Sequence, residues 1–157
     1  MEAHEELLQA KLEALVSRFR AAVECVLKVM DAPSHIQDFP RGCCGIVSEL
    51  MGDYLNTLGI GDFHYVCSAK DGASHAWLEL DGLIIDITGD QFPDRPQVYV
   101  GEPDDWYNEW EEDTRHSAVH DPNAFGYGDE QDFLDQVIDK LNNPEALFQS
   151  DTVLRTS

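Results

Sequence analysis

Apolar side chains recur at every third or fourth position in three stretches of the chain, as they do in helices that bury one face. The first stretch runs from Glu5 to Met30, the second begins at Cys44 and stops at Gly59, and the third covers Asp129–Leu141. The pattern predicts three amphipathic helices. The first could pack on a sheet, or its apolar stripe could form a dimer surface.

Between the second and third helices the apolar pattern changes to a period of two, which indicates strands. Strands are predicted at Phe63–Ala69, Ser74–Leu80, Leu83–Thr88 and Val98–Val100. Asp81-Gly82 is a two-residue turn signal, so the second and third strands are expected to form an antiparallel hairpin.

The hairpin register sorts its side chains onto two faces. If Leu80 pairs with Leu83, the apolar core face carries Ala76, Leu78, Leu80, Leu83, Ile85 and Ile87. The opposite face carries His75, Trp77, Glu79, Ile84, Asp86 and Thr88. His75 and Asp86 become diagonal neighbours across the two strands, about 7–8 Å apart at the backbone, so their side chains can meet.

Cys44 lies in the first turn of the second predicted helix, after the turn-forming Pro40 and Gly42. Unpaired backbone N–H groups and the helix dipole favour a thiolate at that position. Cys43 is the adjacent alternative, because the first turn projects only one of the two toward a cleft. A buried structural thiol is the other interpretation of Cys44.

The order Cys44, His75, Asp86 supplies the three parts of an activated thiol nucleophile. The thiolate attacks an acyl carbon, the imidazole moves the proton, and the carboxylate fixes the tautomer and orientation of the ring. The competing interpretation is a solvated strand carboxylate beside a surface histidine.

These residues resemble the core of the transglutaminase-like superfamily, which belongs to the papain-like cysteine hydrolases and acyltransferases. The family pattern reads Gly-x-Cys, a helix ending in Leu-Gly-Ile, then His-Ala-Trp and Asp-Pro-Thr. The matching segments are Gly42-Cys43-Cys44, Leu58-Gly59-Ile60, His75-Ala76-Trp77 and Asp86-Ile87-Thr88. The resemblance covers residues 39–92, and Ile87 replaces the family's proline.

The resemblance implies an α+β fold with a papain-like core, in which the nucleophile helix packs on an antiparallel sheet flanked by N- and C-terminal helices. Counting back from Leu58-Gly59 makes Cys44 the nucleophile, and the same match makes His75 the base and Asp86 the orienting acid. It also implies a thioester intermediate on Cys44.

An oxyanion donor is needed as well, because the tetrahedral intermediate concentrates charge on one oxygen. The backbone N–H of Cys44 is the default donor. Gln37 lies seven residues upstream, near the place where papain-like enzymes put a glutamine amide, and His35 or Trp77 could serve instead.

The length of 157 residues fits one domain that buries a core of its own. Four cysteines show no disulfide framework and no paired metal spacing, and the acidic N-terminus reads as neither a signal peptide nor a membrane span. A reduced, cytoplasmic protein is therefore expected. Glu102–Asp113, rich in aromatic and acidic residues, is expected to be a loop or short helix near the site, and Arg115–Gly128 a surface loop.

The formal net charge is −21, and most of the acidic excess lies in residues 81–157. Such a surface disfavours nucleic acid and anionic membranes, which bind through Lys and Arg. It could attract a basic protein or substrate, although solubility alone also explains it.

Two functions of different classes follow. The first is a cysteine acyl-transfer enzyme that acts on a peptide, a protein or a small amide or ester and needs no cofactor. The second is an inactive acidic interaction protein on the same fold that binds a basic partner. Metal is not expected, since His64 and Cys67 point to opposite faces of a strand, although Cys44 with His75 could hold zinc in an inactive site.

Overall fold

The computed structural model describes residues 2–29, 39, 44–118 and 127–143. Two long helices, α1 (Glu2–Val29) and α4 (Tyr127–Asn142), stand at the two ends of this part of the chain. Between them lie α2 (Cys44–Thr57), the single turn α3 (Asp105–Asn108) and the 3₁₀ turn η1 (Gly89–Gln91). The fold is α+β, as the sequence predicts.

Five strands form one antiparallel sheet in the order β4-β3-β2-β1-β5. The strands are β1 (His64–Lys70), β2 (Ala73–Leu80), β3 (Leu83–Asp86), β4 (Tyr99–Gly101) and β5 (Glu111–Ser117). Asp81 and Gly82 both have positive φ, at 51° and 85°, which is the backbone of a type I′ hairpin turn. The predicted register of Leu80 with Leu83 is confirmed.

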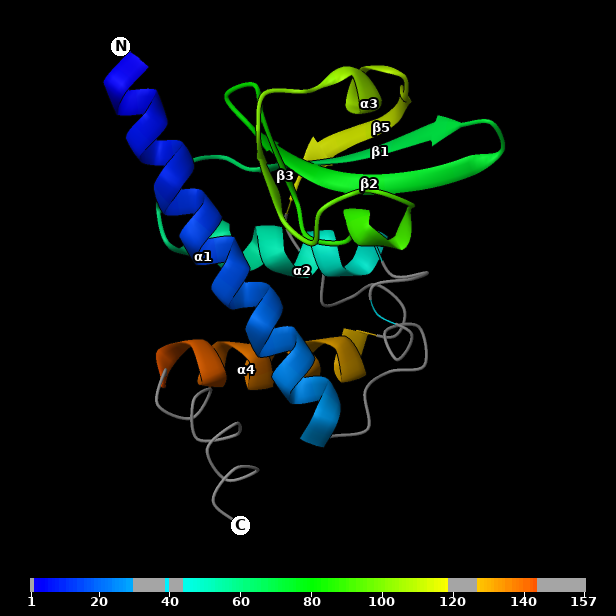
Figure 1. Ribbon diagram of the computed structural model, residues 1–157. Coiled ribbons are helices and arrows are strands. Elements are labelled where there is room, and N and C mark those ends of the chain that lie inside the picture. The colour runs from blue at the N-terminus through cyan, green and yellow to red at the C-terminus, as the bar shows by residue number, and fades with distance from the viewer. Residues whose placement is uncertain (1, 30–38, 40–43, 119–126, 144–157) are drawn as a thin grey trace.

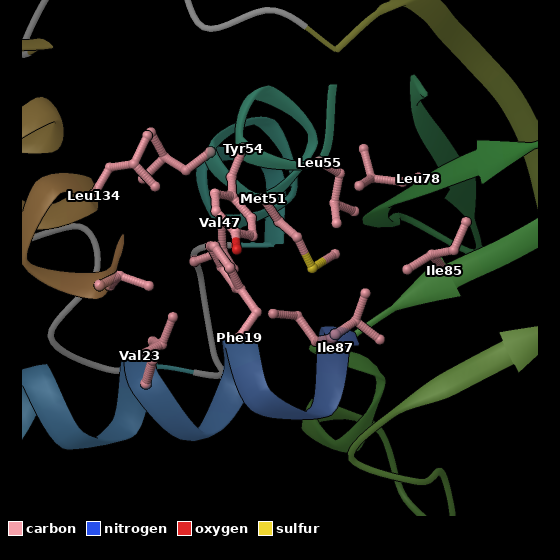
Figure 2. Close-up of a cluster of buried hydrophobic side chains, with 14 of the residues drawn as sticks. Phe19, Val23, Val47, Met51, Tyr54, Leu55, Leu78, Ile85, Ile87 and Leu134 are labelled. Carbon is pink, nitrogen blue, oxygen red and sulfur yellow. The ribbon is translucent and has the colours of Figure 1, made fainter. Parts of the chain in front are cut away.

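The main core lies between the sheet and the long helices. Figure 2 shows side chains from α1, α2, α4 and the hairpin meeting there: Phe19, Val23, Val47, Met51, Tyr54, Leu55, Leu78, Ile85, Ile87 and Leu134. In Figure 1, α1 runs diagonally past α2 and packs on α4, to which Arg18 Nη2 donates a hydrogen bond at Leu141 O (3.1 Å). The apolar stripe of α1 is therefore used within this core.

A second, smaller cluster covers the opposite face of the sheet. Its buried members are Val66, Trp77, Ile84, Tyr107 and Trp110, with Phe92, Tyr99 and Trp106 packed against them. Half of its aromatic residues come from α3 and its flank, which lie on the side of the sheet away from α2 (Figure 1). Both faces of the hairpin are thus buried, and the polar residues between them lie in a protected layer.

Several predicted boundaries are wrong. The third strand ends at Asp86 rather than Thr88, because Thr88 N turns back to donate to Asp86 Oδ1 (2.9 Å). Residues 111–117 belong to β5, since the strand pairs with β1 from Glu111 to Ser117. The end of the loop or short helix expected at Glu102–Asp113 and the start of the surface loop expected at Arg115–Gly128 are therefore both wrong. The remainder of the predicted loop at residues 119–126 lies outside the described residues.

A buried arginine joins α1 to the segment that follows the hairpin. Arg20 is 6% exposed and donates from Nη1 and Nη2 to the two carboxylate oxygens of Asp90, at 2.6 and 2.8 Å. Nη1 also donates to Ile87 O (2.8 Å) and Gln97 O (3.1 Å). Burial alone would lower the pKa of Arg20, but hydrogen bonds to Asp90 and Glu24 raise it above its ordinary value. This guanidinium therefore stays charged and holds η1 in place.

Candidate active site

His75 and Asp86 form a buried pair on the hairpin, as the predicted register requires. His75 Nε2 lies 2.7 Å from Asp86 Oδ2, and the two residues are 0% and 1% exposed. A short contact between an imidazole and a carboxylate in a dry layer is strong, because water does not screen it. The competing interpretation, in which both side chains are solvated, is wrong.

The Asp86 carboxylate is held by donors on both of its oxygens. Oδ1 accepts from Thr88 N (2.9 Å) and Thr88 Oγ1 (3.4 Å). Oδ2 accepts from Tyr107 Oη (2.8 Å) as well as contacting His75. Gly89 packs so closely that an added Cβ would lie 3.1 Å from Oδ2. These contacts satisfy the buried carboxylate and leave it little freedom to turn.

Tyr107 remains a neutral donor to Asp86 across the physiological range. Burial raises the pKa of its hydroxyl, and the negative charge of Asp86 and the hydrogen bond to it raise that pKa further. Arg95 opposes this effect from its place beside the ring, with its guanidinium carbon 5.1 Å from the ring centroid. The carboxylate therefore keeps an O–H donor on Oδ2 beside the histidine.

The second ring nitrogen of His75 faces the side chain of Gln91. Gln91 Nε2 lies 3.3 Å from His75 Nδ1 and 3.0 Å from Thr88 O. Because the Thr88 carbonyl can only accept, the Gln91 atom at this position is the amide nitrogen. Its N–H groups then serve both acceptors, so Nδ1 accepts and the proton of the neutral ring lies on Nε2, directed at Asp86. In this tautomer the lone pair of Nδ1, which accepts from Gln91 here, is the one that can take a proton.

Four aromatic rings surround His75. The centroids lie 5.0 Å away for Phe92, 5.6 Å for Trp77, and 5.9 Å for both Trp106 and Trp110. Phe92 and Trp106 are only partly buried, whereas Trp77 and Trp110 belong to the buried cluster. The rings lower the local dielectric, which strengthens the contact between the imidazole and Asp86.

Helix α2 begins at Cys44 and runs in the same direction as β2. Ser48 Oγ donates to Ala76 O (3.4 Å), and one turn later a Cβ added at Gly52 would meet the Leu78 side chain at 3.0 Å. Four helical residues and two strand residues each advance about 6 Å. Cys44 lies one turn before Ser48, so it is level with the part of β2 two residues before Ala76, next to His75. The predicted start at Cys44 is confirmed, and the helix ends at Thr57, two residues before Gly59 at φ 72°.

The predicted oxyanion donors have different outcomes. Gln37 and His35 lie outside the described residues, as does Cys43. Trp77 is 3% exposed, shares the face of His75, and donates its indole N–H to Glu79 Oε2 (3.1 Å). That proton is already used within the structure.

Tyr107 and Gln91 are site residues that the sequence pattern did not single out. Tyr107 belongs to the segment expected near the site, but its partner could not be read from a helical turn of four residues. Gln91 ends η1, where neither a period of two nor a helical period gives a signal. Its only local sign is its position shortly after Asp86.

Within the described part of the chain, His, Cys, Asp and Glu side chains nowhere gather in threes that could ligate a metal ion. Among the described helices, none combines the length and the apolar run that crossing a bilayer takes.

No protein-family model matches this chain, and neither a curated protein nor a solved structure is significantly similar to it. Any function proposed for this chain therefore depends on the geometry of the site itself.

Proposed function

We propose that this protein is a cysteine-dependent acyl-transfer enzyme on a papain-like, transglutaminase-like core. Cys44 is the nucleophile, His75 the general base and acid, and Asp86 the residue that orients the imidazole. The observation that carries the proposal is the buried His75–Asp86 contact of 2.7 Å, which leaves Nδ1 as the nitrogen that can exchange a proton with a thiol.

The reaction follows from these assignments. His75 Nδ1 takes the thiol proton of Cys44, and the sulfur electron pair forms a bond to the acyl carbon while the carbonyl π pair moves to oxygen. When the carbonyl re-forms, the bond to the leaving amine or alkoxide breaks and the leaving group takes the proton from Nδ1. Water or an amine then attacks the thioester with His75 again as base. Product analysis with and without an added amine distinguishes hydrolysis from acyl transfer.

The start of α2 supports the nucleophile assignment. Cys44 is the first residue of a helix of 14 residues, where backbone N–H groups lack helical partners and the dipole stabilises a thiolate. No acidic residue lies in that first turn to oppose this effect. A reducing compartment such as the cytoplasm would keep the thiol active.

The burial of the dyad, His75 with Asp86, restricts the substrate. His75 has no exposed surface, and its neighbours Gln91 and Phe92 are only partly exposed, so the approach to the site is narrow. A slender amide or ester at the end of a flexible side chain or a small molecule fits this approach better than the middle of a folded polypeptide.

The test is the burst of nitrophenol that p-nitrophenyl acetate releases when an enzyme thiol is acylated. Cys44→Ala and His75→Ala should each reduce acylation by about 10⁴-fold or more, because the nucleophile and its base act as a unit. Asp86→Asn should lose less if Asp86 mainly orients the ring. Cys43→Ala is the matched control and should keep the burst.

An acidic binding protein on the same fold is the second candidate, and β5 favours it. All seven residues of this edge strand are exposed, and three consecutive carboxylates, Glu111, Glu112 and Asp113, open it. Biological activity that survives Cys44→Ala but not the replacement of these carboxylates by amides would select binding over catalysis.

A further inference from the structure

We propose that Gln91 supplies the side-chain hydrogen bond that stabilises the oxyanion, an assignment that rests on the acyl-transfer function proposed above. Nothing in the sequence pattern gives Gln91 a role, and its position in η1 is separate from the upstream segment that contains Gln37.

The Gln91 amide lies beside the nitrogen that takes part in the reaction. Gln91 Nε2 lies 3.3 Å from His75 Nδ1, the nitrogen that must face the thiol once Nε2 is directed at Asp86. A sulfur that hydrogen-bonds to Nδ1 lies beside the same amide, and the acyl carbon bonded to this sulfur can approach it. The oxygen of the tetrahedral intermediate can therefore lie at hydrogen-bonding distance from Gln91 Nε2.

The Gln91 side chain is held in place by its hydrogen bonds and by those of its neighbour. One N–H of the Gln91 side chain donates to Thr88 O at 3.0 Å, and Gln91 N donates to the same carbonyl at 3.3 Å. The preceding residue, Asp90, is bound through both carboxylate oxygens to the buried Arg20. A donor held in this way needs little reorganisation when charge develops, because only the N–H that faces Nδ1 turns to the new charge.

Proton transfer at the moment of attack changes the hydrogen bond that Gln91 can make. Before attack, Nδ1 accepts from Gln91 and the Cys44 sulfur still carries its proton. Once Nδ1 has taken that proton it becomes a donor and no longer accepts from the amide. The thiolate pair then forms the S–C bond, the carbonyl π pair moves to oxygen, and the released N–H of Gln91 can donate to the new negative charge.

Two reagents separate this role from a structural one. Acylation by p-nitrophenyl acetate passes through an oxyanion, whereas alkylation by iodoacetamide displaces iodide at a saturated carbon and forms none. Gln91→Ala and the uncharged Gln91→Met, which is similar in length, should each slow acylation of Cys44 by about 10²–10³-fold, the usual loss for one oxyanion donor. Both variants should leave alkylation of Cys44 nearly unchanged.

The control is Gln97→Ala, which removes an exposed glutamine side chain from the same connecting segment and should change neither rate. Trp110→Phe tests the main competitor, because Trp110 Nε1 is buried without a hydrogen-bond partner among the described residues and its ring lies 5.9 Å from His75. Thermal unfolding of every variant confirms that it is folded.

A selective loss of acylation in both Gln91 variants supports the assignment. Parallel losses of acylation and alkylation would overturn it, because Gln91 would then only position His75. It would equally be overturned if acylation persisted in the Gln91 variants and fell in Trp110→Phe. Wild-type protein whose Cys44 is alkylated but never acylated would refute the proposed function itself.

Discussion

Replacing Arg20 by methionine should destabilise the protein far more than an ordinary surface substitution. Methionine keeps much of the apolar stem but removes the donors to Asp90, Ile87 O and Gln97 O. Removing one partner of a buried ion pair costs about 3–5 kcal/mol, because the other charge and its acceptors are left unpaired. The side chain of Asp90 is 20% exposed and regains some water, which places the expected loss near the lower figure of about 3 kcal/mol.

For a chain of this size, about 3 kcal/mol corresponds to a fall in Tm of roughly 6–12 °C. The matched control is Arg18→Met on the same helix, because Arg18 makes one hydrogen bond to Leu141 O and should cost about 1 kcal/mol. Urea unfolding of both variants measures the difference. Equal losses would refute the inference that Arg20 holds η1, as would a double variant with Asp90→Asn whose losses simply add.

Two further predictions concern Tyr107. Tyr107→Phe should lower the free energy of unfolding in urea by about 1.5–3 kcal/mol, the range for a hydrogen bond to a charged group. The control, Tyr99→Phe, should lower it clearly less, because the Tyr99 hydroxyl donates to the exposed Glu102 O. Equal losses would mean that Asp86 gains little from the Tyr107 hydroxyl. Because burial, and then the charge of Asp86, raise the pKa of Tyr107, this ring should remain protonated when ordinary tyrosines ionise near pH 10. Its raised pKa adds stability that is fully present below about pH 10 and is lost only as the pH rises toward the folded-state value. The ultraviolet absorbance of tyrosinate should therefore differ between the wild type and Tyr107→Phe only at the most alkaline pH or on unfolding. If the wild type already showed the absorbance of one additional tyrosinate near pH 10, the raised pKa of Tyr107 would be contradicted.

The hairpin could be predicted because every signal that defines it is local. Asp81-Gly82 selects the turn, the turn sets the register, and a period of two then places His75 and Asp86 on one face. The contact between them is a direct consequence of that register. Thr88 contacts Asp86 from beyond the end of the strand, so its place beside the pair does not follow from the register.

Strand β5 could not be predicted, because its residues carry no hydrophobic alternation. All seven are exposed, so no buried face marks the sequence, and the strand is defined by pairing with β1. Its edge position and its charges are typical of strands that avoid further pairing.

The supporting residues of the site were out of reach for a different reason. Gln91 and Tyr107 approach the dyad from η1 and α3, whose positions depend on contacts between distant parts of the chain. Arg20 and Asp90 are 70 residues apart, and no local pattern pairs them. Short turns take their place from the surrounding packing, which a single sequence does not display.

The most direct test of the account is the site of the first acyl group that the protein accepts. The wild-type protein is mixed briefly with p-nitrophenyl acetate, quenched in acid, digested, and analysed by mass spectrometry. The account predicts an acetyl thioester on Cys44, formed in the wild type and in Cys43→Ala and lost in His75→Ala. Acetylation confined to Cys43, Cys67 or lysine side chains, or a Cys44 thioester that forms equally well without His75, would contradict it.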